Sequence, residues 1–128
     1  FAEDSSFFLK QVTAVMKEQG YEVVECEDGL EAWEALQSGE YEIDIVVTDI
    51  EMPNLNGFEF AARIKQSQWS DLPVIAMTSL SGTADVQRGL EIGIDDYQVK
   101  MDRDNLLGAL RRFTREKSNS TNRTLQPA

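Results

Sequence analysis

The sequence at residues 43–57 is IDIVVTDIEMPNLNG, and its order of apolar and polar residues decides the fold. The apolar run 43–47 predicts a buried strand that ends near Asp49, and Pro53 and Gly57 then predict a loop. A carboxylate at the carboxyl end of a parallel strand lies in the crevice where open α/β sheets bind ligands. Asp49 is therefore a candidate reactive residue, with an ordinary turn aspartate as the alternative.

Polar side chains also follow three other predicted strands, and their types are those that phosphoryl transfer requires. They are Glu3 and Asp4 after a short apolar stub, Thr78 after the run 74–77, and Lys100 after residues 97–99. Carboxylates gathered beside Asp49 repel one another unless a divalent cation binds, and Mg²⁺ fits because it prefers hard oxygen ligands. A hydroxyl and a compact ammonium supply donors to a phosphoryl group. Each residue alone has an ordinary interpretation as a helix-terminal charge, a cap or a surface lysine, so the prediction depends on the four strand ends together.

Hydrophobic periodicity predicts five alternating strands and helices. The predicted strands are a stub at 1–2, then 21–26, 43–48, 73–78 and 96–100, and the predicted helices are 6–19, 30–36, a segment containing 58–64, 84–92 and a last helix with Leu106, Leu110 and Phe113 on one face. This alternation predicts an α/β fold, a doubly wound parallel sheet of five strands covered by helices on both faces. Because only Phe1 and Ala2 precede the acidic pair, we expect a truncated first strand and a chain that is a fragment of a longer protein.

The chain has 128 residues, which is the size of one domain. We place that domain at residues 1–115 and interpret the Ser-, Asn- and Thr-rich segment 116–128 as a linker or disordered tail. The net charge of −11 argues against binding to nucleic acid or to an anionic membrane, so proteins and a cation are the expected partners. The single Cys26 excludes an internal disulfide, and without a signal-like segment we expect a cytoplasmic protein. Because the chain contains no histidine, it has no phosphohistidine donor of its own.

These residues together make the chain similar to the receiver domains of two-component response regulators. The matching stretches are EDS at 3–5, TDIEMP at 48–53 with Gly57, residues 73–78, and YQVK at 97–100. The resemblance covers residues 1–115 and implies the flavodoxin-like strand order 2-1-3-4-5 with five helices. It also implies a signalling domain that phosphorylates and dephosphorylates itself and turns over no outside substrate.

The resemblance assigns a role to each residue of the site. It implies that a partner histidine kinase phosphorylates Asp49 and that Mg²⁺ is held by Glu3, Asp4, Asp49 and the backbone carbonyl of Glu51. Thr78 and Lys100 would hold the phosphoryl oxygens. Thr78 and Tyr97 would be the switch residues that reshape the face made by the fourth helix, fifth strand and fifth helix. For Tyr97 the alternative is a half-buried strand aromatic whose hydroxyl meets water. A downstream protein is the expected reader of this face, and homodimerisation through it stays open.

Within the family, the chain is most similar to receivers fused to chemotaxis histidine kinases of the CheA type. The signs are SSFF at 5–8, QWSDLP at 68–73 and KMDRD at 100–104. The resemblance implies the receiver end of a hybrid histidine kinase that serves as a phosphate sink or a brake. The alternatives are a chemotaxis adaptor-receiver fusion and an interaction domain that works without phosphorylation.

Two departures and two other function classes complete the sequence interpretation. Many receivers have a proline after the lysine, but here Met101 follows, and we expect a trans bond because a cis bond costs about 2.5–4 kcal/mol. Glu51 occupies a position that influences the phosphoryl lifetime in the family, and no lifetime follows from the sequence.

An Mg²⁺-dependent phosphohydrolase with an aspartate nucleophile would use Glu51 as acid/base, but it usually needs a cap that this chain lacks. A flavin-binding module would need a phosphate-cradling loop where Glu3 and Asp4 place negative charge.

Overall fold

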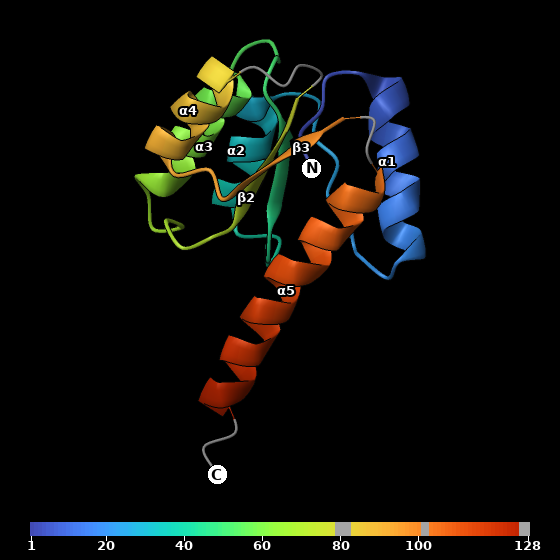
Figure 1. The fold of residues 1–128 in the computed structure, drawn as a ribbon, viewed down its shortest axis with the longest axis vertical. Helices are drawn as coiled ribbons and strands as arrows, with labels where there is room; N and C mark the ends of the chain where they lie inside the picture. The colour runs from blue at the N-terminus through green and yellow to red at the C-terminus, as the bar shows by residue number, and fades with distance from the viewer. Residues whose placement is uncertain (79–82, 101–102, 126–128) are drawn as a thin grey trace.

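A parallel sheet with helices on both faces forms the body of the molecule (Figure 1). The computed structural model describes residues 1–78, 83–100 and 103–125. Strands β1 (Val46–Asp49), β2 (Val74–Thr78) and β3 (Asp96–Val99) are parallel and lie in the order β1-β2-β3. Because parallel strands all point the same way, the residues at their carboxyl ends lie along one edge of the sheet.

The first two predicted strands are present only as single bridges. Ala2 forms one parallel bridge to Cys26 and another to Thr48 in β1. The backbone NH of Asp49 donates to the Ala2 carbonyl at 2.9 Å, and the NH of Cys26 donates to the Phe1 carbonyl at the same distance. The order 2-1-3-4-5 is therefore confirmed, whereas the number of full strands is three in the described part of the chain. The two-residue stub explains this difference, since it pairs at only one position on each side.

Five helices accompany the strands in the described part of the chain, as predicted. They are α1 (Ser6–Glu18), α2 (Gly29–Ser38), α3 (Gly57–Lys65), α4 (Thr83–Ile92) and α5 (Arg103–Leu125). The first three begin at side chains that accept a hydrogen bond from the helix backbone, namely Ser5, Asp28 and Asn56. Such caps satisfy backbone NH groups that otherwise have no partner in the first turn. The helices therefore begin close to where the sequence predicts them.

Helix α5 continues beyond the predicted domain boundary. The sequence predicts a linker or disordered tail at 116–128, but the helix extends to Leu125 and leaves the body of the molecule (Figure 1). Once the packed first half of a helix has formed, each further residue adds a backbone hydrogen bond, and Ser and Asn are not strong helix breakers. The part of the tail prediction that concerns 126–128 lies outside the described residues, and the role of this segment as a linker stays a prediction.

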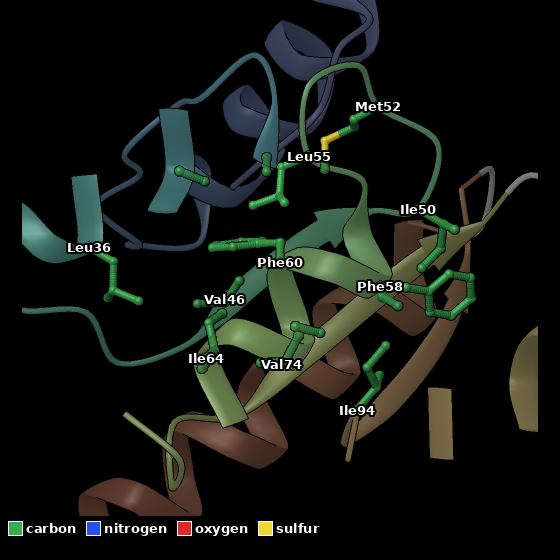
Figure 2. Close-up of a cluster of buried hydrophobic side chains, with 14 of the residues drawn as sticks. Leu36, Val46, Ile50, Met52, Leu55, Phe58, Phe60, Ile64, Val74 and Ile94 are labelled. Carbon is green, nitrogen blue, oxygen red and sulfur yellow. The ribbon is translucent and has the colours of Figure 1, made fainter. Parts of the chain in front are cut away.

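The sheet separates two apolar cores. On one side, α2 and α3 cover the core shown in Figure 2, in which Phe60, Ile64 and Val74 are almost fully buried. On the other side, α1 and α5 cover Ile75 and Met77 of β2. Neighbouring strand residues therefore point into different cores, which explains the unbroken apolar runs of the strands. Leu106 and Leu110 are buried and Phe113 is partly buried, which confirms the predicted apolar face of the last helix. Among the described residues, no helix is both long enough and apolar enough to cross a membrane.

Gly57 lies where helix α3 comes closest to the end of β1. A Cβ added to Gly57 would collide with the Asp49 carbonyl oxygen and lie 2.8 Å from Ile50 Cα. We expect Gly57→Ala to lower the free energy of unfolding by about 1–3 kcal/mol, because rigid backbone has to move.

Urea unfolding measures this effect, and Gly108→Ala in α5 is the matched control. A Cβ on Gly108 meets no atom within 4 Å, so the same change there should raise stability by about 0.5–1 kcal/mol. Equal stability of Gly57→Ala and the wild type would contradict the close approach.

Candidate functional site

The carboxyl edge of the sheet brings the predicted acidic residues and Lys100 together. One carboxylate oxygen from each of Glu3, Asp4 and Asp49 lies within 4.8 Å of the others. The Lys100 Nζ lies 2.8 Å from Glu3 Oε1 and 2.9 Å from Asp49 Oδ2. Residues from the start of the chain, from its middle and from the end of the last strand thus form one polar cluster, as the strand-end argument predicts.

Backbone contacts fix two of these carboxylates. The NH of Ile50 donates to Asp49 Oδ1 at 2.8 Å, and the NH of Ser5 donates to Glu3 Oε2 at 2.9 Å. Lys100 Nζ donates to Asp49 Oδ2, but its close contact with Glu3 Oε1 lacks hydrogen-bond geometry. Glu3 Oε1 therefore accepts no hydrogen bond from the part of the chain that the structure describes.

Burial makes the negative charge in this cluster costly. Glu3 is fully buried and Asp49 is 3% exposed, whereas Asp4 is exposed. Burial raises the pKa of Glu3 to about 7, against the opposing effect of Lys100. Burial likewise raises the pKa of Asp49, although Lys100 opposes that shift too. Burial lowers the pKa of Lys100, but its contacts with the two carboxylates outweigh this and leave the pKa above its usual value.

The donor set fits a small divalent cation. Two buried carboxylates and one exposed carboxylate face a single ammonium, and Glu3 Oε1 has an unused acceptor position. All the donors are hard oxygens, which Mg²⁺ binds at about 2.0–2.1 Å while it keeps several waters. An exposed carboxylate such as that of Asp4 would leave room for those waters.

Thr78 and Tyr97 lie on the neighbouring strands. Thr78 ends β2, pairs with Val99 and accepts a hydrogen bond at its carbonyl from the Lys100 backbone NH at 2.9 Å. Tyr97 lies on β3, half-buried against the core below α2 and α3. The strand ends therefore place Thr78 beside Lys100. The roles predicted for the Thr78 hydroxyl and for Tyr97 stay predictions. The predicted conformation of the bond before Met101 falls outside the described residues.

The loop that carries Glu51 is tied to the start of α2, which sequence reasoning missed. Asn54 has a positive φ of 67°, and its side-chain amide donates to Asp28 Oδ2 at 2.7 Å. The backbone NH of Gly29 donates to the Leu55 carbonyl at 3.1 Å. The Glu51 side chain is exposed, and the predicted role of its carbonyl as a metal ligand stays a prediction. Asn54 could have indicated a turn with positive φ at this position, because asparagine tolerates the left-handed region better than most residues.

Phe8 is a second residue whose position in the site was missed. The sequence places it in the apolar stripe of the first helix, and the structure packs it, half-buried, against the core below α1 and α5. The Lys100 Nζ also lies 5.1 Å from the centre of its ring. An ammonium at this distance from an aromatic face is attracted by the ring quadrupole. Phe8 therefore adds an aromatic contact to the two carboxylate contacts of Lys100.

Comparison with known proteins identifies the family. The model of the response regulator receiver domain matches residues 1–111, and the chain therefore belongs to the response regulator receiver family. The chain is 38% identical over 99 residues to the gliding motility regulatory protein of Myxococcus xanthus and 35% identical over 99 residues to the sensor histidine kinase CheAY of Helicobacter pylori. Each match covers 77% of this chain and only 12% of the relative.

A solved structure agrees with the fold. The response regulator TrrA of Thermotoga maritima in complex with Mg²⁺-BeF is 29% identical and superposes with a TM-score of 0.77, covering 88% of this chain and 94% of that chain. The sequence-based assignment to the receiver family and to the flavodoxin-like fold is thus confirmed.

The raised pKa of Glu3 predicts a pH dependence of stability without metal. The folded carboxyl has a pKa of about 7 and the ordinary value is 4.5, so between these values the folded state binds more protons than the unfolded state. The free energy of unfolding from this group therefore falls as pH rises from about 4.5 to about 7. The raised pKa of Asp49 acts in the same direction.

Urea unfolding in EDTA at several pH values, on the wild type and on Glu3→Gln, isolates this contribution. We expect the wild type to lose stability relative to Glu3→Gln as pH rises through this range. We also expect added Mg²⁺ to reduce the loss, because a bound cation replaces the proton. A stability difference that stays constant with pH would contradict the assignment of the raised pKa to Glu3.

Proposed function

We propose that this chain is the phosphoacceptor receiver domain of a chemotaxis-type two-component system, with Asp49 as the residue that a histidine kinase phosphorylates. The observation that carries this proposal is the position of Asp49. Its carboxylate is buried at the sheet edge, lies within 4.8 Å of two other carboxylates, and receives a hydrogen bond from Lys100.

In the proposed reaction, an Asp49 carboxylate oxygen attacks the phosphorus of the donor. The bond from phosphorus to the donor's leaving group breaks, and the leaving group keeps the electron pair. Glu3, Asp4, Asp49 and the Glu51 carbonyl would hold Mg²⁺, which when bound would supply positive charge near the phosphoryl oxygens. Lys100 exchanges its contact with Asp49 for one with a phosphoryl oxygen, since the attacked carboxylate loses its charge. The Thr78 hydroxyl donates to a second phosphoryl oxygen.

The resulting acyl phosphate is hydrolysed in the same site, so the domain acts as a switch and not as an enzyme with an outside substrate. Phosphorylation adds charge and strong acceptor oxygens, which need donors. Thr78 and Lys100 are the residues proposed to donate to these oxygens. Both adjoin β3, since the backbone NH of Lys100 donates to the Thr78 carbonyl. This connection supports Thr78 and Tyr97 as the switch residues.

The proposed reader of the switch is a protein that binds the face formed by α4, β3 and α5. Leu90 on α4 is 60% exposed and Val99 on β3 is 44% exposed, and such side chains suit a protein interface. The net charge of −11 disfavours nucleic acid and anionic membrane as ligands of this domain. Homodimerisation through the same face is the alternative use of this surface.

We further propose that this domain is cytoplasmic and that its phosphodonor kinase is part of the same polypeptide. This follows from the similarity to CheAY, which by its name is a sensor histidine kinase, and from the small share of that relative which the chain covers. An adaptor-receiver fusion is the alternative arrangement, and in it the kinase would be a separate protein.

Intact-mass measurement after incubation with acetyl phosphate and Mg²⁺ tests the proposed function. We expect addition of one phosphoryl group in the presence of Mg²⁺. We expect no addition when EDTA replaces Mg²⁺ during the incubation. If the folded protein gains no mass at any Mg²⁺ concentration, the proposal fails, and an interaction domain that works without phosphorylation replaces it.

A further inference from the structure

Gly89 in the middle of helix α4 lies directly against the ring of Tyr97. A Cβ added to this buried glycine would collide with the Tyr97 hydroxyl oxygen and lie 2.5 Å from the ring carbon Cζ. Real Cβ atoms essentially never come closer than 3.0 Å to another heavy atom. A side chain at position 89 and the observed ring position therefore exclude each other.

We infer that Gly89 is a positioning residue for the switch: it forms a notch in α4 that holds Tyr97 inward, so the position of the helix and the orientation of the ring are coupled. The inference rests on the proposed function in one respect only, namely that Tyr97 acts as a switch residue. The notch itself depends on the contact between α4 and β3.

The glycine has no evident backbone reason to occur at this position. Residues 83–92 form a continuous helix, and Gly89 does not have the positive φ that Gly93 shows, at 105°, just after the helix ends. Glycine inside a helix costs roughly 0.5–1 kcal/mol relative to alanine. The space that it leaves for the Tyr97 ring offsets this cost, which makes packing the reason for the glycine.

Small residues flank the ring on two sides. Tyr97 pairs with Ala76 of the neighbouring strand β2, and Ala76 is completely buried. Side chains of paired residues in a parallel sheet lie on the same face, so Ala76 leaves room beside the ring as Gly89 does above it. The pocket for the inward ring is thus built from both α4 and β2.

The orientation of the ring determines the surface that a partner meets. Leu90 follows Gly89 in the helix, and Val99 lies two residues beyond Tyr97, on the same face of β3. Leu90 and Val99 are both exposed. With the Tyr97 ring inward they are separate apolar side chains on the surface, whereas an outward ring would lie between them. Gly89 thereby links the packing of α4 to the composition of the proposed protein-binding face.

A double-mutant cycle between Gly89→Ala and Tyr97→Ala tests the notch without any phosphorylation step. In the wild-type background, Gly89→Ala is expected to lower the urea midpoint of unfolding, because the methyl group and the ring compete for one space. In the Tyr97→Ala background, the same change is expected to raise the midpoint, because only the gain in helix propensity remains. An effect of the same sign in both backgrounds would overturn the inference.

Fluorine NMR of the full chain labelled with 3-fluorotyrosine reads the ring directly. The chain has three tyrosines, and the spectrum of Tyr97→Phe identifies the resonance of Tyr97. In Gly89→Ala we expect this resonance to gain the H₂O/D₂O shift of a solvent-exposed ring, like that of the exposed Tyr41, while Gly108→Ala leaves it unchanged. An unchanged Tyr97 resonance in folded Gly89→Ala would also overturn the inference.

Phosphorylation of the same variants separates this inference from the proposed function. With acetyl phosphate and Mg²⁺, Gly89→Ala should gain one phosphoryl group to the same extent as the wild type, because the atoms that a Cβ at position 89 would meet first belong to Tyr97 and not to the acidic cluster. A wild type that gains no mass defeats the proposed function and leaves the notch intact. A reversed sign in the cycle with normal phosphorylation supports both.

Discussion

The Asp49→Asn protein is expected to accept no phosphoryl group from acetyl phosphate and to be more stable than the wild type in the absence of Mg²⁺. The amide has the shape of the carboxylate but lacks its nucleophilic oxygen, so mass addition should disappear completely. Burial raises the pKa of Asp49, which means that the charged carboxylate is disfavoured at this position. Removing that charge should raise the free energy of unfolding by about 0.5–2 kcal/mol, the usual gain from a single stabilising substitution.

Intact mass and urea unfolding in EDTA check the two parts of this prediction. Asp71→Asn is the matched control, because Asp71 is exposed and lies outside the acidic cluster. It should be phosphorylated like the wild type and change stability by no more than about 0.5 kcal/mol. Mass addition to Asp49→Asn would contradict the assignment of the phosphoacceptor, and a loss of stability would contradict the account of the buried charge.

Lys100→Ala is expected to destabilise the metal-free protein and to make its stability strongly dependent on Mg²⁺. Lys100 contacts both buried carboxylates, Glu3 and Asp49, and it is itself largely buried. Removing one partner of a buried ion pair typically costs 3–5 kcal/mol, and we expect about 3 kcal/mol because a fifth of the Lys100 side chain is exposed to water. Mg²⁺ should restore most of this loss, since it provides positive charge to the same oxygens.

Unfolding experiments with and without Mg²⁺ measure this dependence. Lys10→Ala provides a lysine control, because Lys10 forms a surface ion pair with Glu25 and its side chain is 72% exposed. Such pairs contribute about 0–1 kcal/mol, and the Lys10 variant should respond to Mg²⁺ as the wild type does. If Lys100→Ala has wild-type stability in EDTA, the lysine does not compensate the buried carboxylates and the electrostatic account of the site is wrong.

Much of the fold and of the site was predictable because both follow from strand direction. The apolar runs before Asp49, Thr78 and Lys100 identify parallel strands, and parallel strands place their carboxyl ends at one edge. Glu3 and Asp4 join that edge although the first strand is reduced to single bridges. The acidic cluster with Lys100 was therefore predictable without knowledge of any distance.

The remaining features depend on contacts between distant segments. The contact between Gly89 and Tyr97 and the contact between Phe8 and Lys100 each join a helix to the last strand or its end. Periodicity assigns a residue to a face but does not say which side chain of another element it meets. For the same reason the sequence did not reveal that Asn54 ties its loop to α2.

The length of α5 has a different cause. Its last part is polar, with few apolar residues to indicate a buried face, so composition predicted a linker. The helix continues because the packed first half has already met the cost of nucleation. Composition reports whether a segment can be buried and says less about whether its backbone can be helical.

The most direct test of the central claim is to locate the phosphoryl group in the chain. Borohydride reduces an acyl phosphate of aspartate to homoserine, so treatment of the protein after incubation with acetyl phosphate and Mg²⁺ marks the phosphorylated residue. Peptide mass spectrometry should find homoserine at Asp49. Homoserine at Asp4 or at another aspartate, in a sample that has gained a phosphoryl group, would contradict the proposed site.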